Sequence, residues 1–170
     1  MRALMRKEVI EALKLIGQRL NNQGIKWMVV GGTSLALQGV DVESHDIDIL
    51  TNEEGAFRIA ELLKEYEVEP MRFKCSELFR SYLGEFEIKG VKVEVMGDLE
   101  AKMGGKWVRV EVIPHESVEV EGVEIPVPSL REQLKAYEML GREKDKEKMQ
   151  KIREVLKKKA HESEPRQPSS

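Results

Sequence analysis

A short apolar strand, a pair of glycines and a second strand with two acids decide the fold. Residues 26–34 read KWMVVGGTS, and residues 46–50 read DIDIL. The first run is typical of a short buried strand that leads into the glycine pair. Thr33 or Ser34 can cap a brief helix after the glycines, and Gly39 ends it. Strand, turn, short helix and strand together predict the opening of a small α/β unit.

The second strand carries two carboxylates on one face. Residues two apart on a strand project from the same side, so Asp46 and Asp48 point together, whereas Ile47 and Ile49 face the core. Adjacent carboxylates repel each other unless a cation lies between them, and oxygen ligands favour a hard ion such as Mg²⁺. The strand therefore predicts a metal site, and the other interpretation is a strand end with two solvated acids.

A third acid lies on a later alternating strand. Residues 91–95 read VKVEV, so the valines share one face and Lys92 and Glu94 share the other. If this strand pairs beside residues 46–50, Glu94 completes a cluster of three carboxylates. Glu94 equally suits the polar face of an edge strand, and Glu87 and Glu111 are rivals on neighbouring strands.

The glycine pair suggests a phosphate site. Gly31 and Gly32 allow the backbone to approach a phosphate closely, and a helix that opens at Thr33 and Ser34 directs free N–H groups at it. A phosphate cradle beside a divalent metal is what nucleotidyl transfer requires. The alternatives are a plain strand-to-helix turn and, for Ser34, a helix cap.

These motifs resemble a known family. VVGGTS at 29–34, DID at 46–48 and VEV at 93–95 are similar to the signature of the nucleotidyltransferase superfamily that includes DNA polymerase beta. The similarity is greatest to its small members, the minimal nucleotidyltransferases of prokaryotes and the lincosamide and aminoglycoside nucleotidyltransferases. IPVPSL at 125–130 and GREKD at 141–145 resemble a segment that such proteins carry after the catalytic sheet. The resemblance covers residues 24–152.

The resemblance implies a chemistry and a set of site residues. The reaction is in-line attack of an acceptor hydroxyl on the α-phosphorus of a nucleoside triphosphate, with two Mg²⁺ ions, or Mn²⁺ in their place. Each residue has an implied role: Asp46 and Asp48 hold the metals, Glu94 binds the second metal and helps activate the acceptor, and Gly31, Gly32 and Ser34 hold the triphosphate. Arg142 and Lys144 would meet the triphosphate charge if the helix after Ser129 folds back over the site.

Two positions depart from the family pattern. The third acid of the family is usually aspartate, and here it is Glu94. Many relatives place an arginine shortly before the first aspartate, whereas residues 41–44 here read DVES. Both departures bear on catalysis more than on the fold.

The remaining patterns extend the α/β unit. Apolar residues at helical spacing predict a helix through Leu20, and capping boxes at Thr51/Glu54 and Ser129/Glu132 predict two more. A last helix follows Gly141. Strands are predicted over residues 85–88, 91–95, 107–112 and 117–125, with tight turns at Lys89-Gly90 and Glu121-Gly122.

These elements amount to one domain over residues 1–160. Its catalytic core spans about 24–128, its C-terminal helices span 129–160, and residues 161–170 are predicted to form a flexible tail. The expected fold is α/β (α+β), with a small mixed β-sheet, helices on one side and the site on the open face. The 170 residues are 41% hydrophobic, which is enough for a core.

The composition and the charge of the chain exclude some cellular locations and some classes of partner. No apolar run approaches the ~20 residues of a membrane span, the start lacks a signal-peptide pattern, and the single cysteine excludes an internal disulfide, so we expect a cytoplasmic protein. The net charge of −3 does not indicate a nucleic-acid binder, although residues 142–160 hold nine basic residues and four acids. That run is usually a solvated face, and contact with RNA or an acidic partner is the alternative.

The sequence does not identify the acceptor, which is a small molecule, a tRNA or a protein. A homodimer partner could wall in a shallow site. The second hypothesis is a binding protein on the same fold, such as the antitoxin of a toxin–antitoxin pair.

Overall fold

A mixed six-stranded sheet forms the centre of the computed structural model, which describes residues 5–162. Five strands lie in the order β1-β2-β5-β4-β3, and β6 pairs with the far end of β5. The pairing of β2 with β5 is parallel and the others are antiparallel, as a mixed sheet requires. The strands are β1 (Trp27–Val30), β2 (Ile47–Thr51), β3 (Glu67–Cys75), β4 (Phe79–Ile88), β5 (Val91–Met103) and β6 (Lys106–Arg109).

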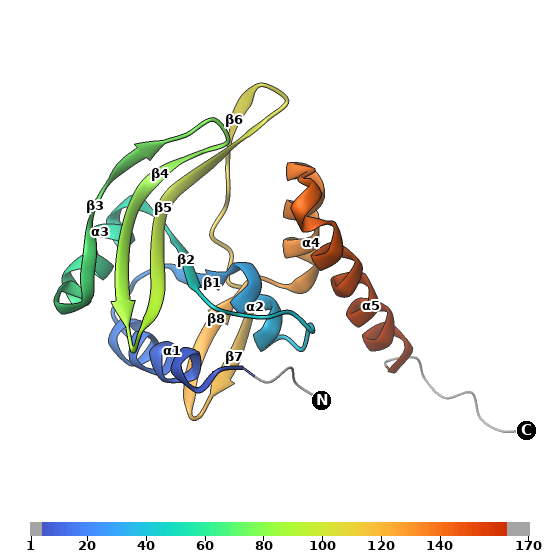
Figure 1. Ribbon diagram of the computed structural model, residues 1–170, viewed down its shortest axis with the longest axis horizontal. Helices are drawn as coiled ribbons and strands as arrows, with labels where there is room; N and C mark the ends of the chain where they lie inside the picture. Colours follow the sequence, from blue (N-terminus) through green and yellow to red (C-terminus); the bar gives the residue numbers. More distant parts are fainter. Residues whose placement is uncertain (1–4, 163–170) are drawn as a thin grey trace, which may run out of the picture.

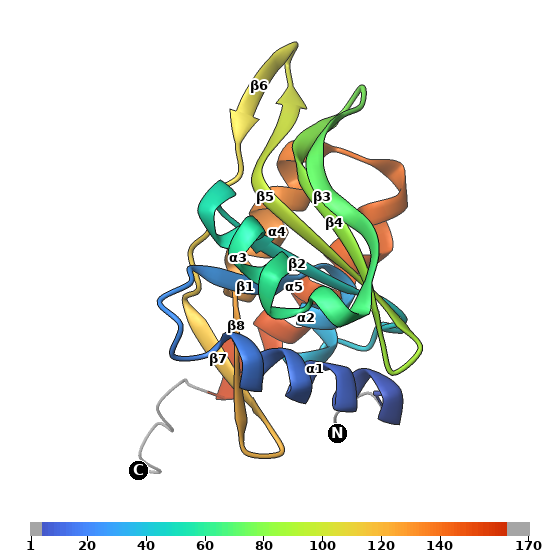
Figure 2. The ribbon, with the colours of Figure 1, turned by 90° about the vertical axis from the view of Figure 1, so that its left-hand side faces the viewer.

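Two helices cover one face of this sheet. They are α1 (Lys7–Leu20) and α3 (Glu53–Leu62), which lie side by side in Figure 2. Both are amphipathic, because their apolar residues recur every three or four positions. Leu13 and Ile16 of α1 are fully buried with Ile49 and Val95 of the sheet. Burying this face leaves the opposite face of β2, β5 and β4 to carry polar side chains.

A second helical layer lies on the other side of the molecule from α3 (Figure 1). It consists of α2 (Gly31–Leu37), α4 (Leu130–Leu140) and α5 (Lys146–Glu162), with a 3₁₀ turn, η2 (Glu143–Asp145), between α4 and α5. A second 3₁₀ turn, η1 (Lys64–Tyr66), follows α3 and leads into β3. The apolar centre of the second helical layer is Leu35, Val40, Leu130, Tyr137 and Ile152. The C-terminal helices therefore pack through α2, the helix that follows the glycine pair.

A separate hairpin supports α1 and β1. It consists of β7 (Glu116–Val120) and β8 (Val123–Val127), and its predicted Glu121-Gly122 turn is confirmed by a positive φ at both residues. A Cβ at Gly17 would lie 2.4 Å from Cγ1 of Val123, so the glycine lets α1 pack directly on β8.

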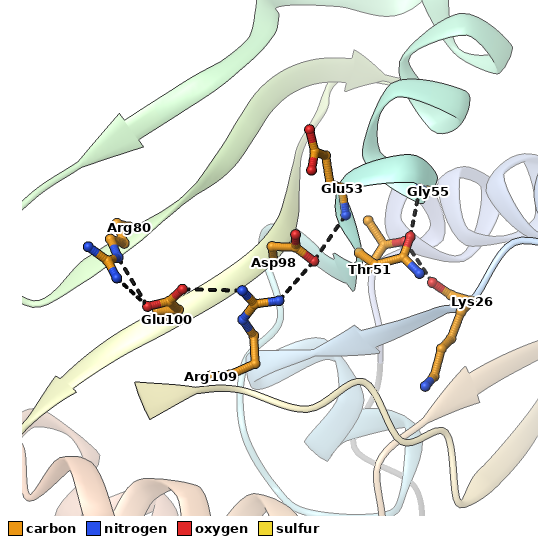
Figure 3. A network of polar contacts seen from close by, with 9 residues as sticks. Lys26, Thr51, Glu53, Gly55, Arg80, Asp98, Glu100 and Arg109 are labelled. Carbon is orange, nitrogen blue, oxygen red and sulfur yellow. Dashed lines mark hydrogen bonds and ion pairs between the residues drawn. The ribbon is translucent and has the colours of Figure 1, made fainter. Parts of the chain in front are cut away.

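The structure corrects three details of the sequence prediction. The short helix α2 begins at Gly31, and neither Thr33 nor Ser34 caps it. Asn52, rather than Thr51, caps α3 by accepting a hydrogen bond from the Gly55 N–H. The Thr51 hydroxyl instead donates to the Lys26 carbonyl, just before β1, at 2.6 Å (Figure 3). The strand predicted over 107–112 ends at Arg109.

The β5–β6 hairpin is fastened by a polar network that no local pattern indicated. Arg109 of β6 pairs with Asp98 at 3.1 Å and with Glu100 at 3.2 Å (Figure 3). Glu100 also pairs with Arg80 of β4 at 2.6 Å, and Asp98 accepts a hydrogen bond from the Glu53 N–H at 3.1 Å. The network ties the distal half of the sheet to the start of α3.

The C-terminal helix is longer than predicted. It continues through Glu162, and residues 163–170 of the predicted tail lie outside the described residues. Within the part of the chain that the structure describes, no helix combines the length and apolar character of a membrane span.

Candidate active site

Three acids lie in a row across three strands. The parallel pairing of β2 with β5 puts Asp48 directly beside Glu94, and the antiparallel pairing of β5 with β4 puts Glu94 opposite Glu85. Residues in register point to the same face, which here is the face opposite the buried Ile49 and Val95. The sequence left the pairing of these strands open, so the sheet order alone brings Asp48 and Glu94 together.

The electrostatics of the row are unfavourable for Asp48. Asp48 is half-buried, whereas Asp46 is exposed just before β2 begins. The pKa of Asp48 is raised to about 6, first by burial and then by the negative charges of Glu94 and Asp46. A carboxylate in this position is stabilised by a cation.

The backbone of the glycine turn lies against the Asp48 carboxylate. Gly31 has a φ of +69°, and a Cβ there would lie 2.8 Å from Oδ2 of Asp48. A side chain would fill this space, so glycine is required for both conformation and contact. Gly31 and Asp48 thus border the same small region of the surface.

Ser34 has a different environment from the glycines. It is fully buried in α2, and its hydroxyl donates to Oε1 of Gln133 on α4 at 2.6 Å. Gln133 in turn donates through Nε2 to the Gly31 carbonyl at 3.3 Å. Gln133, which the sequence analysis did not single out, therefore holds α4 against the glycine turn.

The helix after Ser129 folds back over the site, as the role predicted for Arg142 and Lys144 requires. Tyr137 of α4 has a pKa raised to about 12, by burial first and then by Asp145 and Asp48. Arg142, however, directs its Nε to Oδ2 of the buried Asp145 at 2.7 Å.

A lysine of α5 contributes positive charge to the site. Lys144 is exposed in η2, whereas Lys148 lies close enough to Asp48 to lower the pKa of that carboxyl. The sequence analysis missed this role of Lys148, because its basic run gave no sign of which lysine faces the sheet.

The donor set suits a hard divalent cation, but the side chains are not gathered around one point. No three acid, histidine or cysteine side chains among residues 5–162 form a group that could hold a metal ion. Glu94 is ion-paired with Lys92, at 3.2 Å from Nζ to Oε1. Asp46 and Asp48 are the residues that would hold the cation, with the Gly31 turn beside them.

The rival acids Glu87 and Glu111, and two cavities of the structure, lie outside the row of three acids. Glu111 lines a cavity of about 130 Å³ with Lys26 and Asn52, at the opposite end of β2 from Asp46. Glu87 is in register with Lys92 on the polar face. A larger cavity of about 590 Å³, between α2, β7 and α5, is lined by none of the three candidate acids.

Replacing Gln133 with alanine is expected to destabilise the protein by about 1–2 kcal/mol. The change leaves the buried Ser34 hydroxyl without its acceptor, although Gln38 Nε2 still donates to its oxygen, and it removes a donor from the Gly31 carbonyl. Buried polar groups that lose a hydrogen-bond partner are costly. Urea denaturation measures the free energy of unfolding. Gln150→Ala, on the exposed side of α5, is the control, and an equal effect of the two changes would contradict the assigned role.

Comparisons with known proteins bear on the family and the fold of the chain. A family profile described as aminoglycoside-2''-adenylyltransferase matches residues 12–152. The chain is 39% identical to a Thermotoga maritima protein whose crystal structure is described as that of a nucleotidyltransferase. The match covers 92% of this chain and 97% of that chain, and the TM-score is 0.76. Among curated proteins, none matches the sequence.

Two antibiotic adenylyltransferases share the fold at low identity. ANT(2'')-Ia, solved with adenylyl-2''-tobramycin, is 12% identical, with 87% of this chain and 89% of that chain covered and a TM-score of 0.56. The lincosamide adenylyltransferase LnuA, bound to lincomycin, is 13% identical, with 89% and 98% covered and a TM-score of 0.52.

Proposed function

Because the chain belongs to the aminoglycoside-2''-adenylyltransferase family, we propose that it transfers a nucleoside monophosphate from a nucleoside triphosphate to an acceptor hydroxyl. The fold is nucleotidyltransferase-like, and it supports nucleotide transfer in general. The observation that carries the proposal is the pairing of Asp48 with Glu94 across parallel strands, with Asp46 and the Gly31 turn beside them.

Asp46, Asp48 and Glu94 would have different roles in the reaction. Asp46 and Asp48 would hold Mg²⁺ or Mn²⁺, which when bound neutralises charge on the phosphates and orients them. Glu94 would accept the proton of the acceptor hydroxyl. The bond from the acceptor oxygen to the α-phosphorus forms as the bond from that phosphorus to the pyrophosphate oxygen breaks.

The groups around the acids would position the triphosphate. The backbone at Gly31 and Gly32 can approach the phosphates without steric hindrance. Lys148 supplies positive charge on the α5 side, whereas the Nε of Arg142 is taken by Asp145. The role of Ser34 is indirect, since its hydroxyl bonds to Gln133.

The acids of the open face favour a small cationic acceptor. Glu85 continues the row of Asp48 and Glu94, so negative charge extends across three strands. With a cation at Asp46 and Asp48 to hold the triphosphate, the remaining acids would favour an amine-bearing acceptor over a polyanion such as a tRNA. The compounds in the ANT(2'')-Ia and LnuA structures, adenylyl-2''-tobramycin and lincomycin, are ligands of those proteins and are consistent with a small-molecule acceptor here.

Calorimetric titration with each nucleoside triphosphate, with and without Mg²⁺, tests the proposal. We expect metal-dependent binding that weakens at least about tenfold in Asp46→Asn/Asp48→Asn, because two of the carboxylates that would hold the metal are neutralised. The matched control is Glu119→Gln/Glu121→Gln, which removes the same charge from the β7–β8 hairpin. Failure of the folded wild type to bind any nucleotide would contradict catalysis and favour the partner-binding alternative.

A further inference from the structure

Lys92 lies at the centre of the acidic face. It is on β5, two residues before Glu94, so both side chains project from the same side of the sheet. Its Nζ lies 3.2 Å from Oε1 of Glu94 and 3.7 Å from Oε1 of Glu85. The Lys92 side chain is 47% exposed, so its ammonium can move away without unfolding the strand.

The surrounding charges keep this lysine protonated. The pKa of Lys92 is raised by its hydrogen bond to Glu94 and the charge of that residue, and further by Glu85 and Asp46. Lys92 in turn lowers the pKa of Asp48, as does Lys148 from α5. The Lys92 ammonium thus partly neutralises acids on three strands that are adjacent in the sheet, β2, β5 and β4.

We propose that Lys92 is an intramolecular counter-ion that pairs with Glu94 until a divalent cation binds at Asp46 and Asp48, and then releases it. The inference rests on the proposed function, because it assumes a cation site at Asp46 and Asp48. It is consistent with acids that are in register but not gathered around one point. Lys92 is a positioning residue, which acts through Glu94.

The strength of the contact suits a reversible role. A half-exposed ion pair is weak, since water and salt screen it and the lysine stem pays entropy when it is fixed. A divalent cation carries twice the charge and prefers oxygen ligands. It can therefore compete with the ammonium for Glu94.

Mn²⁺ binding to the full chain, followed by the electron paramagnetic resonance signal of free Mn²⁺, tests the proposal without any assay of activity. Lys92→Met keeps the length of the side chain and removes the charge, and we expect it to bind Mn²⁺ roughly three- to tenfold more tightly. Lys92→Arg keeps the cation and is expected to bind as the wild type does. Lys106→Met, on the β5–β6 hairpin, removes one positive charge elsewhere and controls for overall charge.

Thermal unfolding gives a second readout. In EDTA, Lys92→Met is expected to unfold below the wild type, because the acids lose their counter-ion, and Mn²⁺ is expected to raise its midpoint more than that of the wild type. Wild-type binding with no gain in Lys92→Met beyond Lys106→Met would overturn the counter-ion role alone. Absence of Mn²⁺ binding in every variant would overturn both this role and the proposed metal-dependent function.

Discussion

Asp48→Asn is expected to raise the thermal stability of the protein in EDTA at pH 7, with an increase in Tm of roughly 4–8 °C. The pKa of Asp48 is raised to about 6 in the folded protein, from an ordinary value of 3.8, because the side chain is half-buried and lies near the negative charges of Glu94 and Asp46. A difference of two pKa units corresponds to about 3 kcal/mol, and screening by solvent reduces this to about 2 kcal/mol. Asparagine has nearly the same shape and carries no charge, so it removes the penalty.

The pH dependence gives the sign of this effect. The folded state binds the Asp48 proton more tightly than the unfolded state, so ionisation of Asp48 costs stability as pH rises from about 4 to 6. The difference in unfolding free energy between Asp48→Asn and the wild type should be small at pH 4 and complete above pH 6. Asp41→Asn, at an exposed position, is the control, and a difference that does not change with pH would contradict this account.

Arg142→Ala is expected to destabilise the protein by about 3 kcal/mol and to lower its Tm by roughly 6–12 °C. Asp145 has no exposed surface, and its Oδ2 accepts a hydrogen bond from Nε of Arg142 at 2.7 Å. Its other oxygen, Oδ1, already has no hydrogen-bond partner. Removal of the guanidinium therefore leaves a buried carboxylate without its counter-ion. Denaturation in the absence of nucleotide measures the loss.

Two further variants separate this pair from an ordinary surface ion pair. Arg153→Ala breaks an exposed ion pair, in which Nη2 of Arg153 lies 3.5 Å from Oε1 of Glu138. This change should alter the free energy of unfolding by less than about 0.5 kcal/mol. Arg142→Met/Asp145→Leu removes both charges and should recover most of the loss. If Arg142→Ala costs no more than Arg153→Ala, Arg142 is not structural and its side chain is free for the triphosphate.

Local patterns predicted most elements because their causes are local. The Ser129 cap of α4 is confirmed by its hydrogen bond from the Glu132 N–H, and the Lys89-Gly90 turn is confirmed by the positive φ of both residues. Predictions were wrong where a side chain had a distant partner. Thr51 was expected to cap α3, but its hydroxyl donates to the Lys26 carbonyl, just before β1.

The residues of the candidate site also fall into two groups, those that local sequence identifies and those that distant packing brings in. The spacing of Asp46 and Asp48 and the glycine pair are contiguous features, so the sequence could identify them. Gln133 and Lys148 reach the site only because α4 and α5 pack back through α2, more than 80 residues later in the chain. Helical spacing shows that a residue is on a helix face but does not show which strand that face meets.

The sequence by itself determined the α/β class, the helix caps and hairpin turns, and the strand faces that carry Asp48 and Glu94, because periodicity and turn chemistry act between near neighbours. Only the tertiary structure decided that β2 pairs parallel with β5, with Asp48 beside Glu94. It also decided that Lys92 neutralises Glu94 and that Arg142 belongs to Asp145. The reason is physical: sheet order and helix return are set by burial of the whole apolar core, and the charges take the partners that this packing leaves within reach.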